Sequence, residues 1–257
     1  EIVRIARSFL ATNGVRQHVR VVAEPPNEKM PYLQQVPPLV KSVGRALEDM
    51  WIANLRDLNV CSQKGLGERF DSTVGAASVL MPFGGKYQLT PSEAMVAKLP
   101  VLHGQTNTAS AMAFGFDPDL STWSPFHGAV YAIVEAVAKI VASGGDARKV
   151  RLTLQEYFER LGTDPKKWGK PFAALLGALY AQHEMGIPAI GGKDSMSGTF
   201  ENLNVPPTLV AFAVSTVRSD DVISPEFKYP NNKVIMVPVP NDAQDLPVFA
   251  RLNTNFE

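Results

Sequence analysis

Residues 127–143, with the sequence HGAVYAIVEAVAKIVAS, decide the fold. Their apolar side chains recur at helical spacing and share one face, and the glycine pair that follows is a typical helix stop. Glu135 and Lys139 are the only charged residues in the stretch, four positions apart on one side of the helix. We therefore predict a helix covered on most sides, whose charged strip faces a cleft or an interface. Its apolar face consists of Val130, Ile133, Val134, Val137, Ile140 and Val141.

Short apolar runs and glycine turns lie on both sides of this helix along the chain. A second helix is predicted over residues 171–185, with Phe172, Leu175, Leu176 and Leu179 turned inward. Strands alternating with two long helices indicate an α/β or α+β sandwich, with helices on one face of a sheet. The predicted strands are residues 74–81, 106–115, 150–154, 209–217 and 233–239.

The two ends of the chain differ from its middle in composition and in predicted secondary structure. Residues 1–38 finish in a proline-rich stretch, which favours extended backbone, and a helix is predicted over residues 39–56. A polar linker follows the strand at 209–217, and the strand at 233–239 begins a unit that the sequence does not complete. We expect one whole domain at about 58–218, flanked by parts of its neighbours at 1–57 and 219–257.

Bulk composition excludes several classes of protein. Lys plus Arg equals Asp plus Glu, at 25 each, so no basic excess suggests a nucleic-acid partner. No apolar run reaches the roughly 20 residues that span a bilayer, and no signal peptide is visible. The single cysteine, Cys61, excludes an internal disulfide and suits a reducing compartment, so we expect a cytoplasmic protein. The absence of an initiator Met suggests an excised or processed piece.

The loop of residues 191–198, GGKDSMSG, is the most informative polar stretch. Glycines let backbone N–H groups approach an anion closely. Lys193 supplies a positive charge, Asp194 a carboxylate for Mg²⁺ or a proton, and Ser195 and Ser197 supply hydroxyl groups. The spacing is not that of a phosphate-binding Walker loop, because Asp194 stands where Ser or Thr should be. The alternative is a polar glycine turn between a helix and a strand.

The other polar clusters have structural explanations that involve no ligand. Glu135 and Lys139 could form an exposed ion pair worth only ~0.3–0.5 kcal/mol. Lys64, Arg69 and Asp71 precede the first strand and could be a solvated turn. The stretch 83–91 reads as a glycine turn into a short helix, with Thr90 as its N-cap and Pro91 at its first position. The four histidines lack metal-ligand spacing, and Cys61 is expected to be a buried structural thiol.

Four motifs of the sequence belong together. They are LNVCSQKGL at 58–66, RFDSTVG at 69–75, MPFGG with QLTP at 81–91, and GKDSMS at 192–197. Together they resemble phosphoribosylformylglycinamidine synthase. The resemblance runs over about 58–218, and GKDSMS is its most specific part.

The resemblance implies a sheet domain like the N-terminal domain of aminoimidazole ribonucleotide synthetase, from the second half of the synthetase. Two such domains pair into a central barrel in this family. The full enzyme uses ATP to activate the amide oxygen of formylglycinamide ribonucleotide as an iminophosphate, and ammonia from glutamine displaces phosphate. The glutaminase domain is absent here, so the isolated chain is expected to be inactive and to self-associate through its sheet. Its expected partners are the remaining synthetase and glutaminase domains and a small-molecule substrate.

The resemblance also implies where nucleotide and metal would bind. The loop residues Gly192, Lys193, Asp194, Ser195 and Ser197 would serve substrate or phosphate, and no catalytic residue is assigned. Large members hold an auxiliary ADP with Mg²⁺, whose ligands include a Glu that maps onto Glu135 and an Asn that maps onto Lys139. A further Asp maps onto Gln105. A protonated Lys cannot ligate Mg²⁺, so this chain departs from the family there.

Two functional hypotheses remain open. In the first, the chain is part of an ATP-dependent carbon–nitrogen ligase, with Lys64, Asp71, Gln105 and Lys139 as nucleotide-binding candidates. In the second, it is a structural half-domain that holds, or has lost, an auxiliary nucleotide site, with neither ATP nor Mg²⁺ bound in the isolated chain. Selenophosphate synthetase and thiamine-phosphate kinase share the fold, but they carry Asp-rich metal motifs that this sequence lacks.

Overall fold

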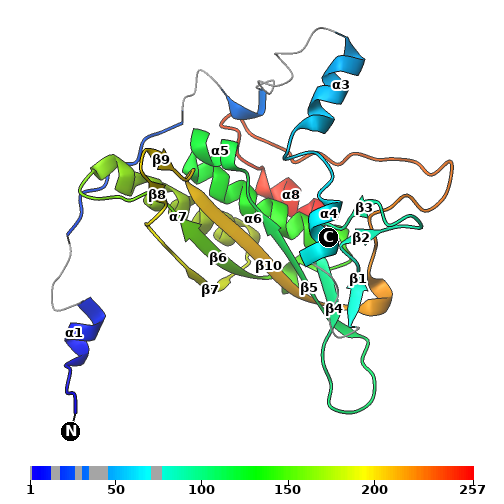
Figure 1. The fold of residues 1–257 in the computed structure, drawn as a ribbon, viewed down its shortest axis with the longest axis horizontal. Helices are drawn as coiled ribbons and strands as arrows, with labels where there is room; N and C mark the ends of the chain where they lie inside the picture. The colour runs from blue at the N-terminus through cyan, green and yellow to red at the C-terminus, as the bar shows by residue number, and fades with distance from the viewer. Residues whose placement is uncertain (1, 13–17, 27–30, 35–45, 71–76) are drawn as a thin grey trace.

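A computed structural model describes residues 2–12, 18–26, 31–34, 46–70 and 77–257. Its centre is a six-stranded sheet in the order β1-β4-β5-β10-β6-β7 (Figure 1). All neighbouring strands are antiparallel except β6 and β7, which run parallel at one edge. The strands are β1 (Ser78–Leu80), β4 (Met95–Lys98), β5 (Thr108–Gly115), β10 (Thr208–Arg218), β6 (Arg151–Tyr157) and β7 (Ala189–Lys193).

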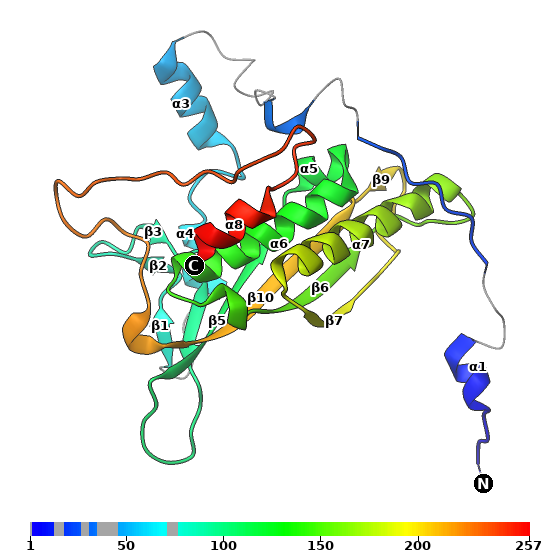
Figure 2. The same ribbon diagram turned by 180° about the vertical axis from the view of Figure 1, so that it is seen from behind.

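The long helices lie on one face of this sheet, in front of it in Figure 2. Helix α6 (Pro125–Ala142) packs directly on β5 and β10, and helix α7 (Pro165–Met185) packs beside α6. The α+β sandwich predicted from sequence is therefore confirmed at the level of a mixed sheet with helices on one face. The shorter helices are α1 (Arg7–Thr12), α3 (Leu47–Arg56), α4 (Lys64–Phe70), α5 (Pro118–Trp123) and α8 (Phe249–Phe256), with 3-10 turns η1 (Tyr32–Gln34), η2 (Ala147–Lys149) and η3 (Ser219–Asp221).

Helix α6 forms the core as its sequence predicts. Five of the six predicted face residues are buried, and Val141 is half-buried. The Ser124 hydroxyl caps the first turn by accepting from the His127 backbone N–H, and Pro125 occupies the first position. The helix is long and apolar enough to cross a membrane by composition, but 56% of it is buried inside the molecule, as in a core helix of a soluble protein.

The helix predicted at 171–185 is present as α7, but it begins six residues earlier, at Pro165, and faces the other way. Phe172, Leu175, Leu176 and Leu179 are 42–63% exposed, so the inward assignment of these residues was wrong. The buried face is a small-residue face, and a Cβ atom at Gly177 would overlap the backbone carbonyl of Phe126 at the start of α6. Small side chains let the two helices approach closely, and this leaves the larger side chains outside. The buried residues are Gly169, Pro171, Ala173, Ala174, Gly177, Ala178 and Ala181.

The second face of the sheet carries apolar side chains without a covering helix. Side chains alternate along a strand, so the residues between the buried alanines of β5 point away from α6. Met112 and Phe114 on β5 and Met95 on β4 are exposed on that face, and Phe212 on β10 lies 6.5 Å from Phe114 between ring centres. Within the described residues this surface has no covering layer (Figure 1).

Two strand and turn predictions were wrong. Residues 233–239 form no strand, and the side chains of residues 234–237 are 67–84% exposed, because no neighbouring strand pairs with them. Thr90–Pro91 is strand β3, paired with β2 (Phe83–Gly84), where a short helix was expected. A second small hairpin joins β8 (Thr199–Phe200) and β9 (Leu203–Asn204).

The remaining predicted elements are confirmed with shifted ends. The strands predicted at 106–115, 150–154 and 209–217 are β5, β6 and β10, and β1 covers the described end of the strand predicted at 74–81. Helix α3 covers the C-terminal part of the helix predicted at 39–56, and none of its residues is buried. Residues 39–45 and 74–76 lie outside the described residues. Cys61 is half-buried, so the prediction of a fully buried thiol was wrong.

The chain after β10 returns to α6 and is fixed there by polar contacts. The Nε2 atom of His127 lies 2.9 Å from the Gln244 carbonyl oxygen, and its Nδ1 lies 2.7 Å from the Ser124 hydroxyl. The Tyr131 hydroxyl donates to Asn241 Oδ1 at 2.8 Å and lies 2.9 Å from the Asp245 carbonyl. Burial lowers the pKa of His127, with the nearby Gln244 carbonyl, Asp245 and Asp242 opposing that shift.

Candidate functional site

The 191–198 loop begins as an edge strand and stays attached to β6 beyond its end. Lys193 pairs with Gln155, and the ladder then continues through two hydrogen bonds. The Ser195 N–H donates to the Glu156 carbonyl at 3.1 Å, and the Phe158 N–H donates to the Ser195 carbonyl at 2.9 Å. The Ser195 amide is therefore used within the sheet and is not available to bind an anion.

The loop side chains nevertheless remain available. Lys193, Asp194 and Ser197 are exposed, and the hydroxyl oxygens of Ser195 and Ser197 lie 2.9 Å apart. Gly192 has a purely structural requirement, because a Cβ atom there would overlap the Leu154 carbonyl oxygen of β6. The loop can therefore offer an ammonium, a carboxylate and two hydroxyls to a ligand.

Glu156, which the sequence analysis did not single out, lies directly beside this loop. The continued register pairs it with Asp194, and in parallel strands such neighbours point to the same face. Glu156 is only 6% exposed, and its buried Oε1 atom has no hydrogen-bond partner. Burial, helped by the nearby charge of Asp194, raises its pKa to about 7.

A signal for Glu156 was present in the sequence. Leu152, Leu154, Glu156 and Phe158 share one face of β6 by alternation, and Leu152 and Phe158 are fully buried. A carboxylate among inward-pointing apolar residues is the kind of exception that marks a site.

The predicted charged strip on α6 faces the end of β5, where it forms a closed network of polar contacts. Lys139 Nζ lies 2.7 Å from Glu135 Oε1 and 3.4 Å from Glu93 Oε2, and it donates to the Phe114 carbonyl at 3.1 Å. The other carboxylate oxygen of Glu135 accepts from the Phe116 N–H at 3.0 Å. Three oxygens thus surround the ammonium, and both oxygens of Glu135 are engaged.

These contacts do not fit a Mg²⁺ ion at Glu135. Its coordinating oxygen already contacts an ammonium, whose charge repels a divalent cation. Among the residues that the structure describes, no group of three or more His, Cys, Asp or Glu side chains could hold a metal. The expectation of Glu135 as a metal ligand therefore finds no support in this geometry.

The three nucleotide-binding candidates that the structure describes, Lys64, Gln105 and Lys139, do not converge on one place. Lys64 lines a cavity of about 190 Å³ with Met81, Pro82, Phe83 and Gln88, so two of the motifs behind the family resemblance do meet. Its ammonium pairs with Glu68 at 3.4 Å. Gln105 is exposed on the loop between β4 and β5, and Lys139 lies in its own network on α6. Asp71 lies outside the described residues.

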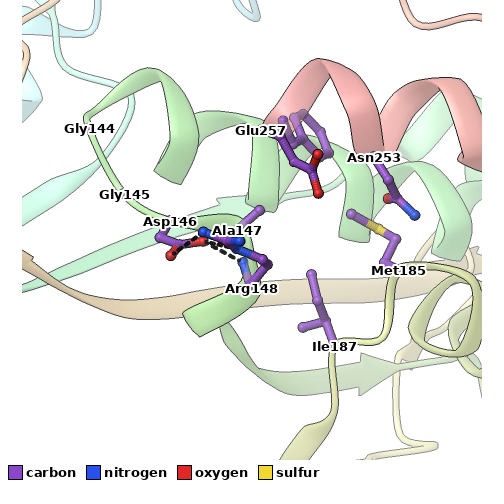
Figure 3. Close-up of a pocket in the computed structure, with 10 residues that line it drawn as sticks. Gly144, Gly145, Asp146, Ala147, Arg148, Met185, Ile187, Asn253 and Glu257 are labelled. Carbon is purple, nitrogen blue, oxygen red and sulfur yellow. Dashed lines mark hydrogen bonds and ion pairs between the residues drawn. The ribbon is translucent and has the colours of Figure 1, made fainter.

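A separate cavity of about 440 Å³ opens at the C-terminal ends of α6 and α7 (Figure 3). Arg148 is the cation on its wall, and its guanidinium is held by Asp146 at 3.1 and 3.2 Å. That pairing lowers the pKa of Asp146. None of the residues predicted from sequence to form a site lines this cavity.

The fold and the site define a class of protein before any relative is considered. The chain is an α+β sandwich domain with one open sheet face. The polar residues of its candidate site lie at the edge strand β7 and on the adjacent strand β6. No protein-family model matches the sequence.

The curated relatives that the chain resembles share one name. The chain is 23% identical to the phosphoribosylformylglycinamidine synthase subunit PurL of Thermoplasma volcanium, over 85% of this chain and 28% of that protein. It is 25% identical to PurL of Pyrobaculum aerophilum, over 77% of this chain and 27% of that protein. The resemblance found in the sequence is thus confirmed, and the chain spans little more than a quarter of these relatives.

Solved structures agree at the level of the fold. The structure of PurLQS from Thermotoga maritima matches with a TM-score of 0.56 and 18% identity, over 80% of this chain and 29% of that one. Thermotoga maritima PurL complexed with ATP matches with a TM-score of 0.51 and 21% identity, over 65% and 25%. The chain therefore has the fold of part of PurL.

Proposed function

We propose that the chain is part of an ATP-dependent ligase that converts formylglycinamide ribonucleotide to the amidine, with glutamine as the nitrogen donor. Residues 58–218 would be the N-terminal-type sheet domain of the second synthetase half, like that of aminoimidazole ribonucleotide synthetase. Residues 1–57 and 219–257 would belong to its neighbours, and the cytoplasm would be its location. The PurL relatives support the ligase part of this assignment.

The open sheet face is the observation that carries the proposal. Met95, Met112 and Phe114 present apolar side chains on the face opposite α6. A contiguous apolar surface on a soluble protein marks an interaction site. A second sheet domain of the same enzyme, packing face to face, would bury it. The remaining synthetase and glutaminase domains would belong to the same assembly.

The exposed loop groups would contribute to a composite active site. The Lys193 ammonium suits a phosphate oxygen, and the hydroxyls of Ser195 and Ser197 suit a polar substrate. A site of this kind positions and stabilises developing charge, which is the main task of the protein in phosphoryl transfer. The nucleotide would be ATP, supplied with Mg²⁺.

A second candidate function is favoured by the Lys139 network. Because Lys139 saturates Glu135 and Glu93, this part of the chain would be a structural half-domain that no longer holds an auxiliary Mg²⁺–ADP. The two candidate functions concern different places and are compatible in one protein.

Activity assays test the first function. The full-length protein that carries this chain should form the amidine from formylglycinamide ribonucleotide, ATP and either glutamine or ammonia. The 257-residue chain alone should not. In the full-length protein, Lys193→Ala should lower kcat/KM by about a hundredfold, as removal of a charge-stabilising donor does. Lys149→Ala, an exposed lysine on η2, is the matched control and should change nothing. Turnover of ammonia by the isolated chain would contradict the proposal, as would an unaffected Lys193→Ala.

Light scattering tests the sheet interface. The isolated chain should self-associate, and Phe114→Lys on the open face should reduce association. A monomer at high concentration that binds no apolar dye would contradict the open face.

A further inference from the structure

Glu156 and Asp194 place two carboxyl groups side by side at the base of the 191–198 loop. The Glu156–Asp194 pairing follows from the hydrogen bonds on either side of it, Lys193 opposite Gln155 and Ser195 bonded to the Glu156 carbonyl. Adjacent parallel strands lie ~4.8 Å apart, so side chains in register on the same face are within reach of one small ion.

The Glu156 carboxyl lacks compensation from the protein. Its Oε1 atom is buried without a hydrogen-bond partner, although the residue is only 6% exposed. Lys167 and Lys170 on α7 both pair with Glu159. Lys193 precedes Asp194 and so points to the opposite face of the strand. A buried carboxylate without a partner is costly, so a missing positive partner is indicated.

The chemistry of the surroundings selects the kind of partner. Mg²⁺ binds oxygen ligands, and in nucleotide-dependent enzymes it is held by one or two carboxylates, several waters and substrate phosphates. Asp194 is exposed, so waters and a phosphate can complete the coordination from the solvent side. Ser195 and Ser197 lie in the same loop, and their hydroxyl oxygens contact each other at 2.9 Å.

We propose that Glu156 and Asp194 hold a divalent cation at the base of the 191–198 loop, with open positions for water and for a nucleotide phosphate. The phosphate part rests on the proposed ligase function, whereas the metal part does not. The cation would link the buried end of β6 to the exposed loop.

Manganese binding tests the site. The probe is Mn²⁺ alone, followed by electron paramagnetic resonance in the full-length protein without nucleotide. Glu156→Gln and Asp194→Asn should each weaken one Mn²⁺ site by about tenfold or more. Glu201→Gln is the matched control, since Glu201 is an exposed carboxylate in the neighbouring β8–β9 turn. Asp194→Asn changes an exposed side chain, so it keeps the test informative if Glu156→Gln perturbs folding.

The possible outcomes distinguish failure of this metal site from failure of the proposed ligase function. Loss of one Mn²⁺ site in both variants, with the control unchanged, supports the cation whether or not the protein has ligase activity. Equal Mn²⁺ binding by the parent and both variants overturns it, and it would mean that the Glu156 carboxyl holds only a proton. Ligase activity without this Mn²⁺ site would overturn the inference and leave the proposed function standing.

Discussion

Glu135 on α6 and Glu156 on β6 are two carboxylates with opposite surroundings. Glu135 is partly exposed, contacts the Lys139 ammonium at 2.7 Å and accepts from the Phe116 N–H at 3.0 Å. Glu156 is buried, and one of its oxygens has no partner. Family resemblance assigns a metal to Glu135, whereas the cation that we propose lies at Glu156. The comparison bases the proposed cation on an uncompensated buried carboxyl group and not on position in a motif.

The largest expected effect comes from removing the Glu156 charge. Its folded pKa of about 7 lies above the ordinary 4.5, so the fold favours the protonated form. That stabilisation is fully present below pH 4.5 and is lost as the pH rises through 7. By linkage the loss amounts to about 3 kcal/mol.

In chelator-containing buffer, Glu156→Gln should remove most of this loss between pH 5 and pH 8. Urea unfolding at both pH values measures it. An identical pH dependence in parent and variant would show that Glu156 is solvated or already paired.

Lys139 should have an intermediate effect. Lys139→Met leaves Glu135 and Glu93 close together without their ammonium, and it should cost about 1–2 kcal/mol in the free energy of unfolding. Glu93→Gln removes only the longer contact of 3.4 Å and should cost less. If neither substitution changes the free energy of unfolding, the network does not contribute to stability.

Lys139→Asn sharpens the same comparison through ligand binding. The parent should bind Mg²⁺–ADP weakly at this site, because the ammonium repels the cation. The asparagine variant removes that charge and should raise the affinity. Calorimetric titration of the full-length forms measures both. Tight, magnesium-dependent ADP binding by the parent, unaltered by the substitution, would contradict the role given to Lys139.

His127 should respond to pH in the opposite direction from Glu156. Its pKa is lowered by burial, so its contribution to stability is present above the ordinary value of 6.5 and is lost as the pH falls. Asp242 and Asp245 face it and moderate the effect. Thermal melts of His127→Gln at pH 5.5 and 7.5 should show a smaller acid loss than the parent. A parallel loss in both would assign the acid sensitivity to another group.

The exposed leucines of α7 should matter least for folding. Leu179→Gln should change the free energy of unfolding by no more than about 0.5 kcal/mol, as exposed substitutions do. Its matched partner on the inner face, Ala178→Leu, overpacks the contact with α6 and should cost about 1–3 kcal/mol. Denaturant titration of the two variants decides whether the leucine face is truly outside.

The sequence predicted the elements of α6 and α7 better than their orientation. Both helices follow from periodicity, but α7 has two faces that could be buried, one of leucines and one of small residues. Which face of α7 is buried depends on how closely the backbone of α6 approaches Gly177. That distance is a property of the tertiary structure. The strand predicted at 233–239 did not form because a strand requires a partner, which local pattern does not supply.

The candidate site was predicted in composition but not in geometry. Lys193, Asp194 and Ser197 in the 191–198 loop are exposed, but the Ser195 backbone amide donates to β6. That pairing joins residues some 40 positions apart, so the neighbourhood of Asp194 could not be read from the sequence near it. Glu156 became a candidate only once this register was known.

The open sheet face has a calorimetric consequence. Met95, Met112 and Phe114 remain 38–53% exposed on that face. Apolar surface that is already hydrated in the folded chain adds nothing to the heat-capacity increment of unfolding. Burial of this face against a partner sheet should therefore appear as a negative heat-capacity change of binding.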